Sequence, residues 1–171
     1  KNKPILLIAG DPKSIFFEIL FKSIRKKKYK SPLILICNKK ILVNQMKYFK
    51  FKRKLKILKV EKIKNEKINN KSLNIVDVNL KVSSNTLSQY NFDKDYIKRS
   101  FNIALKLIAL GITKKIINGP INKKKFLNKK FLGITEYISS LYKKKNVGML
   151  IYNKKLSVCP LTTHLPLKQV P

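Results

Sequence analysis

The chain of 171 residues has few acidic groups, five glycines, one histidine and no tryptophan. A single imidazole cannot form a metal site by itself, because zinc takes three or four protein ligands. The two cysteines, Cys37 and Cys159, lie far apart and form no C-x-x-C pair. We therefore expect two free thiols in a reducing compartment.

Long apolar runs are also missing. No stretch approaches the roughly 18 apolar residues of a membrane span, because charged residues such as Glu18 and Lys106 interrupt the longest ones. The apolar run near the start ends at Ala9 and is followed by Gly10-Asp11-Pro12, which argues against a secretory signal peptide. We expect a cytoplasmic protein with no membrane segment.

Negative charge is scarce, with 8 Asp and Glu against 40 Lys and Arg and a formal net charge of +32. Taken alone, this excess favours a partner such as nucleic acid or an anionic membrane. Only Arg25, Arg53 and Arg99 are arginines, however, and the other 37 basic residues are Lys. Codons rich in A and T encode Lys, Ile and Asn, so coding bias explains the charge. A nucleic-acid surface would use more Arg, whose planar fork suits phosphates. We expect no specific nucleic-acid partner, and a basic nucleic-acid-binding protein stays as an alternative.

Short apolar runs alternate with helical patterns along the chain. Continuous runs predict buried strands, at residues 5–9, 32–37, 73–78 and 115–118. Apolar spacing of three and four residues predicts helices between them, at residues 15–24, after Asn38 and from Asp93 to Ile112. Ser14, Asn38 and Asp93 are the expected caps, and residues 62–71 are expected as a surface loop. This alternation predicts an α/β fold with three layers (α/β/α) and a mostly parallel sheet.

The last third of the chain predicts smaller elements. Residues 123–128 and 135–142 have helical patterns, and residues 147–152 and 156–159 predict a strand pair. Ligands in α/β folds bind beyond the carboxyl ends of the strands, which directs attention to the loops after Ala9, Asn118 and Cys159. Gly10-Asp11-Pro12 could hold an anion at the next helix start, or Asp11 is a turn residue. The chain has no G-x-G-x-x-G and no Walker A sequence, so neither standard nucleotide site is predicted.

Three later segments carry a resemblance to a known family. They are G-I-T-E-Y at 133–137, M-L at 149–150 and T-T-H-L-P-L at 162–167. Together they resemble the 4-hydroxythreonine-4-phosphate dehydrogenase family of pyridoxine phosphate (vitamin B6) biosynthesis. N-G-P-I-N-K at 118–123 and G-D-P at 10–12, with Glu18 six residues later, resemble further elements of that family. The order and spacing agree over essentially the whole chain.

The resemblance implies a fold and an activity. The fold is that of the isocitrate and isopropylmalate dehydrogenases. The enzyme oxidises the secondary alcohol of 4-phosphooxy-threonine with NAD or NADP, and the resulting keto acid loses CO₂ to give 3-amino-2-oxopropyl phosphate. A divalent metal (Zn, Mg or Co) is held by three histidines in a homodimer with a shared active site, and His164 matches one of them. Ile134 and Thr135 match substrate contacts, whereas no residue is assigned to acid–base catalysis or cofactor binding.

The chain departs from the family in three places. Ile134 replaces a histidine, which removes a polar contact to substrate worth about 1–3 kcal/mol. The turn after Pro12 lacks the family's glycines, and the family's chains are roughly twice as long. We therefore expect residues 1–171 to be the N-terminal portion of a two-lobed α/β enzyme, truncated at both ends, with an incomplete fold and no activity alone. Ile134 also leaves open a related sugar-acid phosphate dehydrogenase or an inactive partner subunit.

Overall fold

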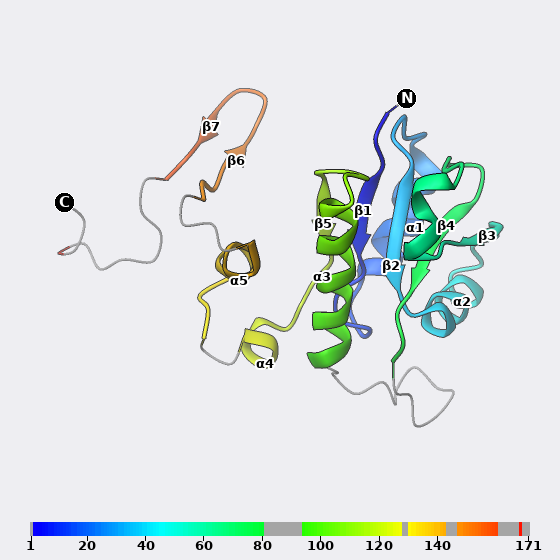
Figure 1. The fold of residues 1–171 in the computed structure, drawn as a ribbon, viewed down its shortest axis with the longest axis horizontal. Coiled ribbons are helices and arrows are strands. Elements are labelled where there is room, and N and C mark those ends of the chain that lie inside the picture. The colour runs from blue at the N-terminus through cyan, green and yellow to red at the C-terminus, as the bar shows by residue number, and fades with distance from the viewer. Residues whose placement is uncertain (1, 81–93, 128–129, 143–146, 161–167, 169–171) are drawn as a thin grey trace. The chain divides into compact units, whose positions relative to one another are not determined.

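The computed structural model describes residues 2–80, 94–127, 130–142, 147–160 and 168. The chain divides into two compact units, residues 1–122 and residues 123–171. Figure 1 shows the parallel sheet of the first unit and the smaller elements of the second.

The first unit is built on a sheet of five strands in the order β3-β4-β2-β1-β5. Their bounds are Ile5–Ile8 for β1, Leu33–Cys37 for β2, Leu55–Ile57 for β3, Leu73–Asp77 for β4 and Ile116–Asn118 for β5. Every neighbouring pair is parallel. All five residues of β2 are buried, as expected of a strand covered on both faces. The predicted parallel α/β sheet is confirmed.

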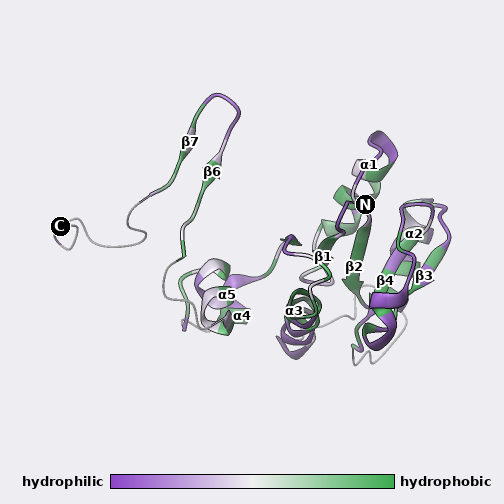
Figure 2. Ribbon diagram, turned by 45° about the horizontal axis from the view of Figure 1, so that its top comes forward, coloured by the Kyte–Doolittle hydropathy of each residue, from purple (hydrophilic) through white to green (hydrophobic). Residues whose placement is uncertain are grey.

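Helices cover both faces of this sheet. They are α1 (Phe16–Lys26), α2 (Lys39–Tyr48) and α3 (Lys94–Ala109). The β1-α1-β2 and β2-α2-β3 connections run one way along the sheet, and the connection from β4 through α3 to β5 runs the other way. Because such crossovers are right-handed, α1 and α2 lie on one face and α3 on the other. Figure 2 shows α1 and α3 on opposite sides of hydrophobic central strands. The predicted three layers are present.

The predicted N-cap residue is found at the start of α2 but not at the start of α1. The Asn38 side chain caps α2, because its oxygen accepts the Ile41 N–H at 3.2 Å. Ser14 is not the N-cap residue of α1, because that position is Ile15, but its hydroxyl oxygen accepts the Phe16 N–H at 3.4 Å. Ser14 belongs instead to a turn in which its own N–H donates to the Asp11 carbonyl oxygen at 2.9 Å. That turn delays the helix to Phe16, and the Asp93 cap lies outside the described residues.

The segment at 62–71 was predicted as a surface loop, and this prediction is wrong at its start. Residues Val60–Asn65 form a short 3₁₀ helix, η1. Ile63 is the reason, because its side chain is buried in the core while the lysines on either side of it are exposed. One apolar residue among lysines is enough to attach the segment to the core.

The second unit is small and has little core. Its elements are α4 (Lys123–Leu127), α5 (Ile134–Tyr142), β6 (Ile151–Tyr152) and β7 (Ser157–Val158). Tyr137 packs its ring 5.0 Å from Phe126 and 5.6 Å from Phe131, centroid to centroid. β6 and β7 pair antiparallel, and all four of their residues are exposed. The predicted helices and strand pair are confirmed, with shorter strands than expected.

Two smaller expectations can also be compared with the structure. Cys37 and Cys159 are both free thiols, the first buried and the second exposed. Among the residues that the structure describes, no helix has the length and apolar character needed to cross a membrane.

A buried polar cluster closes the carboxyl ends of β2 and β4. The Tyr96 hydroxyl on α3 accepts the Asn38 N–H at 3.1 Å, and the Asn38 side chain donates to the Val78 carbonyl oxygen at 3.0 Å. Cys37 lies beside this pair and is fully buried. Burial, and then the nearby Asp77 carboxylate, raise the pKa of the Cys37 thiol. Burial is also the main cause that raises the pKa of Tyr96.

These shifts predict a loss of stability at high pH. Below the ordinary thiol pKa of 9.0, Cys37 is neutral in both the folded and the unfolded chain, so it does not make the free energy of unfolding depend on pH. Above it, only the unfolded thiol ionises, so the free energy of unfolding falls by about 1.4 kcal/mol per pH unit for each such group. Urea unfolding between pH 8 and pH 11 measures the slope. Cys37→Ala should make the slope shallower, and an unchanged slope contradicts the assignment.

Candidate functional site

Two loops that the sequence analysis singled out meet at the carboxyl edge of the sheet. The loop after β1 holds Gly10 and Asp11, and the loop after the neighbouring strand β5 holds Gly119 and Pro120. The Asp11 N–H donates to the Pro120 carbonyl oxygen at 2.9 Å, and the Gly119 N–H donates to the Ile8 carbonyl oxygen at 2.7 Å. Segments more than 100 residues apart in the chain are thereby joined backbone to backbone.

Glycine is required on both sides of this contact. Gly10 has φ +76°, and a Cβ there would collide with the Pro120 carbonyl oxygen. A Cβ on Gly119 would collide with the Ala9 carbonyl oxygen and lie 2.6 Å from the Phe16 ring. Both glycines are therefore explained by the close approach of two backbones, with no ligand needed to account for them.

The polar residues of the first loop make local contacts. The Asp11 carboxylate accepts the Lys13 N–H at 3.0 Å, so the turn interpretation of Asp11 is correct. Glu18 pairs with Lys22 at 2.6 Å across one turn of α1, on the surface. In the described structure both carboxylates therefore stabilise local structure, the first a turn and the second a helix.

Ile134 and Thr135, the expected substrate contacts, occupy the first turn of α5. Ile134 is half-buried and Thr135 is exposed. The Glu136 carboxylate lies against Gly133, where a Cβ would be 2.7 Å from its Oε2. The structure thus places the two residues side by side at a helix start, with the Thr135 hydroxyl accessible.

The expected metal ligand His164 lies outside the described residues. Within the described ranges, no group of three or more His, Cys, Asp and Glu side chains could hold a metal ion. The described residues alone therefore do not form a metal site.

Two structurally important polar residues carried no sequence signal. Tyr96 stands within an amphipathic helix pattern that describes its burial but not its hydrogen bond to Asn38. Asn70 joins three backbone groups, since its side chain accepts the Leu33 N–H and donates to two carbonyl oxygens. In a chain so rich in asparagine, nothing distinguishes this one from its neighbours.

The first unit is an α/β domain of the three-layer class, with its loops gathered at the carboxyl edge of a parallel sheet. The family model described as "Pyridoxal phosphate biosynthetic protein PdxA" matches residues 28–171. The chain belongs to the PdxA family.

Curated relatives agree with this assignment. The chain is 30% identical to 4-hydroxythreonine-4-phosphate dehydrogenase of Aquifex aeolicus, covering 99% of this chain and 52% of that protein. It is 28% identical to the enzyme of the same name from Wigglesworthia glossinidia brevipalpis, covering 99% and 51%. The chain therefore spans about half the length of these relatives.

Solved structures show the same fold. The crystal structure of 4-hydroxythreonine-4-phosphate dehydrogenase from Klebsiella pneumoniae superimposes with a TM-score of 0.76 at 23% identity, covering 98% of this chain and 53% of that one. The enzyme of that name from Burkholderia phymatum gives 0.73 at 19% identity, covering 97% and 51%.

The loop contact can be tested by two glycine substitutions that share one backbone conformation. Gly111 ends α3 with φ +77°, close to Gly10, but a Cβ there meets nothing within 4 Å. Gly111→Ala should cost about 1–2 kcal/mol for the left-handed conformation alone. Gly10→Ala adds overpacking and should cost about 3 kcal/mol or more of the free energy of unfolding in urea. Equal costs for the two variants contradict the close approach.

Proposed function

We propose that this chain forms part of a 4-hydroxythreonine-4-phosphate dehydrogenase. The reaction is oxidation of the secondary alcohol of 4-phosphooxy-threonine, followed by decarboxylation to 3-amino-2-oxopropyl phosphate. The family match over residues 28–171 carries this proposal, and two curated relatives that bear the enzyme's name support it across 99% of the chain. A nicotinamide cofactor, NAD or NADP, accepts the hydride.

The residues proposed for substrate and metal follow the family's pattern. Thr135 offers a hydroxyl to the substrate from the first turn of α5, where its exposure makes it accessible. The N–H groups of a first helical turn also favour an anion such as a phosphate or carboxylate. We assign His164 as one ligand of a divalent metal (Zn, Mg or Co), which would act as a Lewis acid on substrate oxygens when bound.

A homodimer with a shared active site is also proposed. The hairpin of the second unit supports it, because a two-stranded hairpin is marginal without a packing partner. Large apolar residues are exposed on and beside this hairpin, and the most exposed are Leu150, Ile151, Tyr152 and Leu156. A concentration of exposed apolar residues of this kind is typical of an interface, and a second copy of the chain would cover it. As a metabolic enzyme with free thiols, the protein would work in the cytoplasm.

Ile134 favours one alternative within the family. Where the family has a histidine, this side chain cannot donate a hydrogen bond to an oxygen of the substrate. A related sugar-acid phosphate would place different groups there, so a sugar-acid phosphate dehydrogenase is the second candidate.

The activity is tested by following the absorbance of reduced nicotinamide. The assay uses the longer protein of which this chain is proposed to form part. It is supplied with Mg²⁺ or Zn²⁺, with NAD⁺ or NADP⁺, and with either 4-phosphooxy-threonine or a panel of sugar-acid phosphates. Reduction with 4-phosphooxy-threonine is expected. Reduction only with a sugar-acid phosphate selects the second candidate, and no reduction with any substrate contradicts both.

Restoring the family's histidine should strengthen substrate binding. Ile134→His adds a polar contact worth about 1–3 kcal/mol, so KM for 4-phosphooxy-threonine should fall between about fivefold and a hundredfold. Ile138→His is the matched control, because Ile138 is also half-buried and lies one turn further along α5. If both variants change KM equally, position 134 does not contact the substrate.

The proposed interface is tested with two tyrosines of equal exposure. Tyr152 in the hairpin and Tyr48 at the end of α2 are each 72% exposed. Because aromatic anchors dominate interfaces, Tyr152→Ser should raise the dimer dissociation constant about tenfold or more, whereas Tyr48→Ser should not change it. Sedimentation equilibrium measures both values. A monomeric wild-type protein, or equal effects, would count against a dimer through the hairpin.

A further inference from the structure

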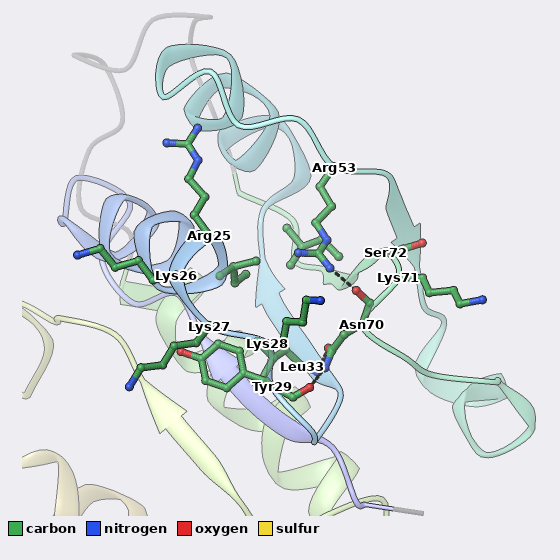
Figure 3. Close-up of a pocket in the computed structure, with 12 residues that line it drawn as sticks. Arg25, Lys26, Lys27, Lys28, Tyr29, Leu33, Arg53, Asn70, Lys71 and Ser72 are labelled. Carbon is green, nitrogen blue, oxygen red and sulfur yellow. Dashed lines mark hydrogen bonds between the residues drawn. The ribbon is translucent and has the colours of Figure 1, made fainter.

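A basic cavity of about 620 Å³ opens at the amino ends of β2 and β4. It lies between the α1–β2 connection and the segment before β4, as Figure 3 shows. This edge of the sheet is opposite to the carboxyl edge where the Gly10 and Gly119 loops meet. The cavity is therefore separate from those loops, and the proposed dehydrogenase function gives it no role.

Positive charge is concentrated at this cavity. Six of its twelve lining residues are basic, against 40 of 171 in the whole chain. These residues are Arg25, Lys26, Lys27, Lys28, Arg53 and Lys71. The ion pairs among the described residues involve Lys22, Lys56 and Lys98, so no described carboxylate pairs with these six. Like charges held this close repel one another, and a bound anion would relieve that repulsion.

The frame of the cavity is fixed by hydrogen bonds. Asn70 accepts the Leu33 N–H at 2.9 Å and donates to the Tyr29 and Ser31 carbonyl oxygens at 2.8 and 2.9 Å. Arg53 donates to the Asn70 carbonyl oxygen. These bonds join the α1–β2 connection to the segment before β4. Since the two walls are already joined, a ligand would not have to order them on binding.

Both arginines that border the cavity are held by backbone carbonyl oxygens, Arg53 toward Asn70 inside it and Arg25 toward the end of α2 (Figure 3). Arg25 donates to the Phe49 and Lys50 carbonyl oxygens at 2.9 Å each and lies 5.7 Å from the centre of the Phe51 ring. Neutral carbonyl oxygens leave the charge of a guanidinium uncompensated. Coding bias explains lysines in this chain but not arginines, and two of the three arginines border this one cavity.

The shape and chemistry of the cavity fit a small phosphorylated molecule. Its volume is within the range of small-molecule sites, and buried Leu33 and Leu73 line part of its surface. Tyr29 is the one aromatic residue among the twelve that line the cavity. A site for a nucleic-acid strand would instead use a long groove with several stacking rings. We propose that this cavity binds the diphosphate group of a small molecule. Lys28, which points inward in Figure 3, and the exposed Lys27 and Lys71, which would turn inward on binding, contact the phosphate oxygens.

Titration calorimetry with ADP and with inorganic pyrophosphate, near physiological ionic strength, tests the proposal. The cavity variant is Lys27→Gln/Lys28→Gln/Lys71→Gln. The matched control is Lys59→Gln/Lys62→Gln/Lys64→Gln, which removes the same charge from exposed lysines in and beside η1. Because charge-assisted hydrogen bonds are the strong ones, the cavity variant should bind about tenfold more weakly or worse. The control should change affinity less than about twofold, since it removes only screened long-range attraction.

The two ligands separate the possible sources of the diphosphate. Tighter binding of ADP indicates a nucleotide, and equal binding of pyrophosphate indicates that the diphosphate alone is recognised. Either result, with the loss confined to the cavity variant, supports the proposal. No binding of either ligand, or equal losses in the two variants, overturns it. A single-stranded oligonucleotide that binds more tightly than ADP and is weakened equally by both variants also overturns it, in favour of unspecific charge attraction.

These substitutions are all on exposed side chains, so unfolding is not the expected cause of a loss. Urea unfolding of both variants checks this point, and a cavity variant that still folds but has lost binding supports the site. The outcome is independent of the dehydrogenase assay, because neither variant changes Ile134, Thr135 or His164.

Discussion

The approach of two backbones at Gly10 and Gly119 is the constraint on which the first unit depends. Strand β5 pairs with β1 over only three residues, and the loops beyond them continue the contact through the Asp11 N–H and the Pro120 carbonyl oxygen. Side chains at either glycine would force the loops apart. The position of β5 then fixes where α3 must end, and Gly111 makes that end possible through its left-handed conformation. Gly10 and Gly119 thus serve the carboxyl edge of the sheet, and Gly111 serves the opposite edge, before β5 begins.

Much of the fold follows from the sequence, because buried parallel strands leave a plain signal. The apolar runs at 5–9 and 32–37 contain β1 and β2, and the Asn38 cap is where the pattern predicts it. The errors come from single side chains. Ile63 attaches a lysine-rich segment to the core, and the turn from Asp11 to Ser14 delays α1. Neither effect is visible in periodicity, because each depends on a contact that is formed only in the folded chain.

Less of the candidate sites than of the fold could be predicted from the sequence. Ile134 and Thr135 are neighbours in the chain, so predicting that they lie together at the start of α5 required only the position of the helix start. The basic cavity could be found only from the topology, because Lys28 and Lys71 line one cavity only where β2 and β4 lie side by side. Asn70, which holds that region together, was hidden by the composition of the chain. Coding bias also hid the basic cluster in the sequence. Lysines are frequent throughout the chain, so a group of them that lines one cavity can be recognised only from the folded structure.

The pairing of β5 with β1 also has a consequence for the order in which the protein is made. β1 can pair with β2 early in synthesis, because β2 follows within 30 residues. Its other edge can pair with β5 only after residues 116–118 have left the ribosome. At synthesis rates of about 5–20 residues per second, that edge is unpaired for roughly 5–20 s. During this interval Leu6, Leu7 and Ile8 present an apolar strand edge of the kind that promotes aggregation. The large positive charge of the chain keeps nascent copies apart in that time, so a composition set by coding bias would still protect this unpaired edge.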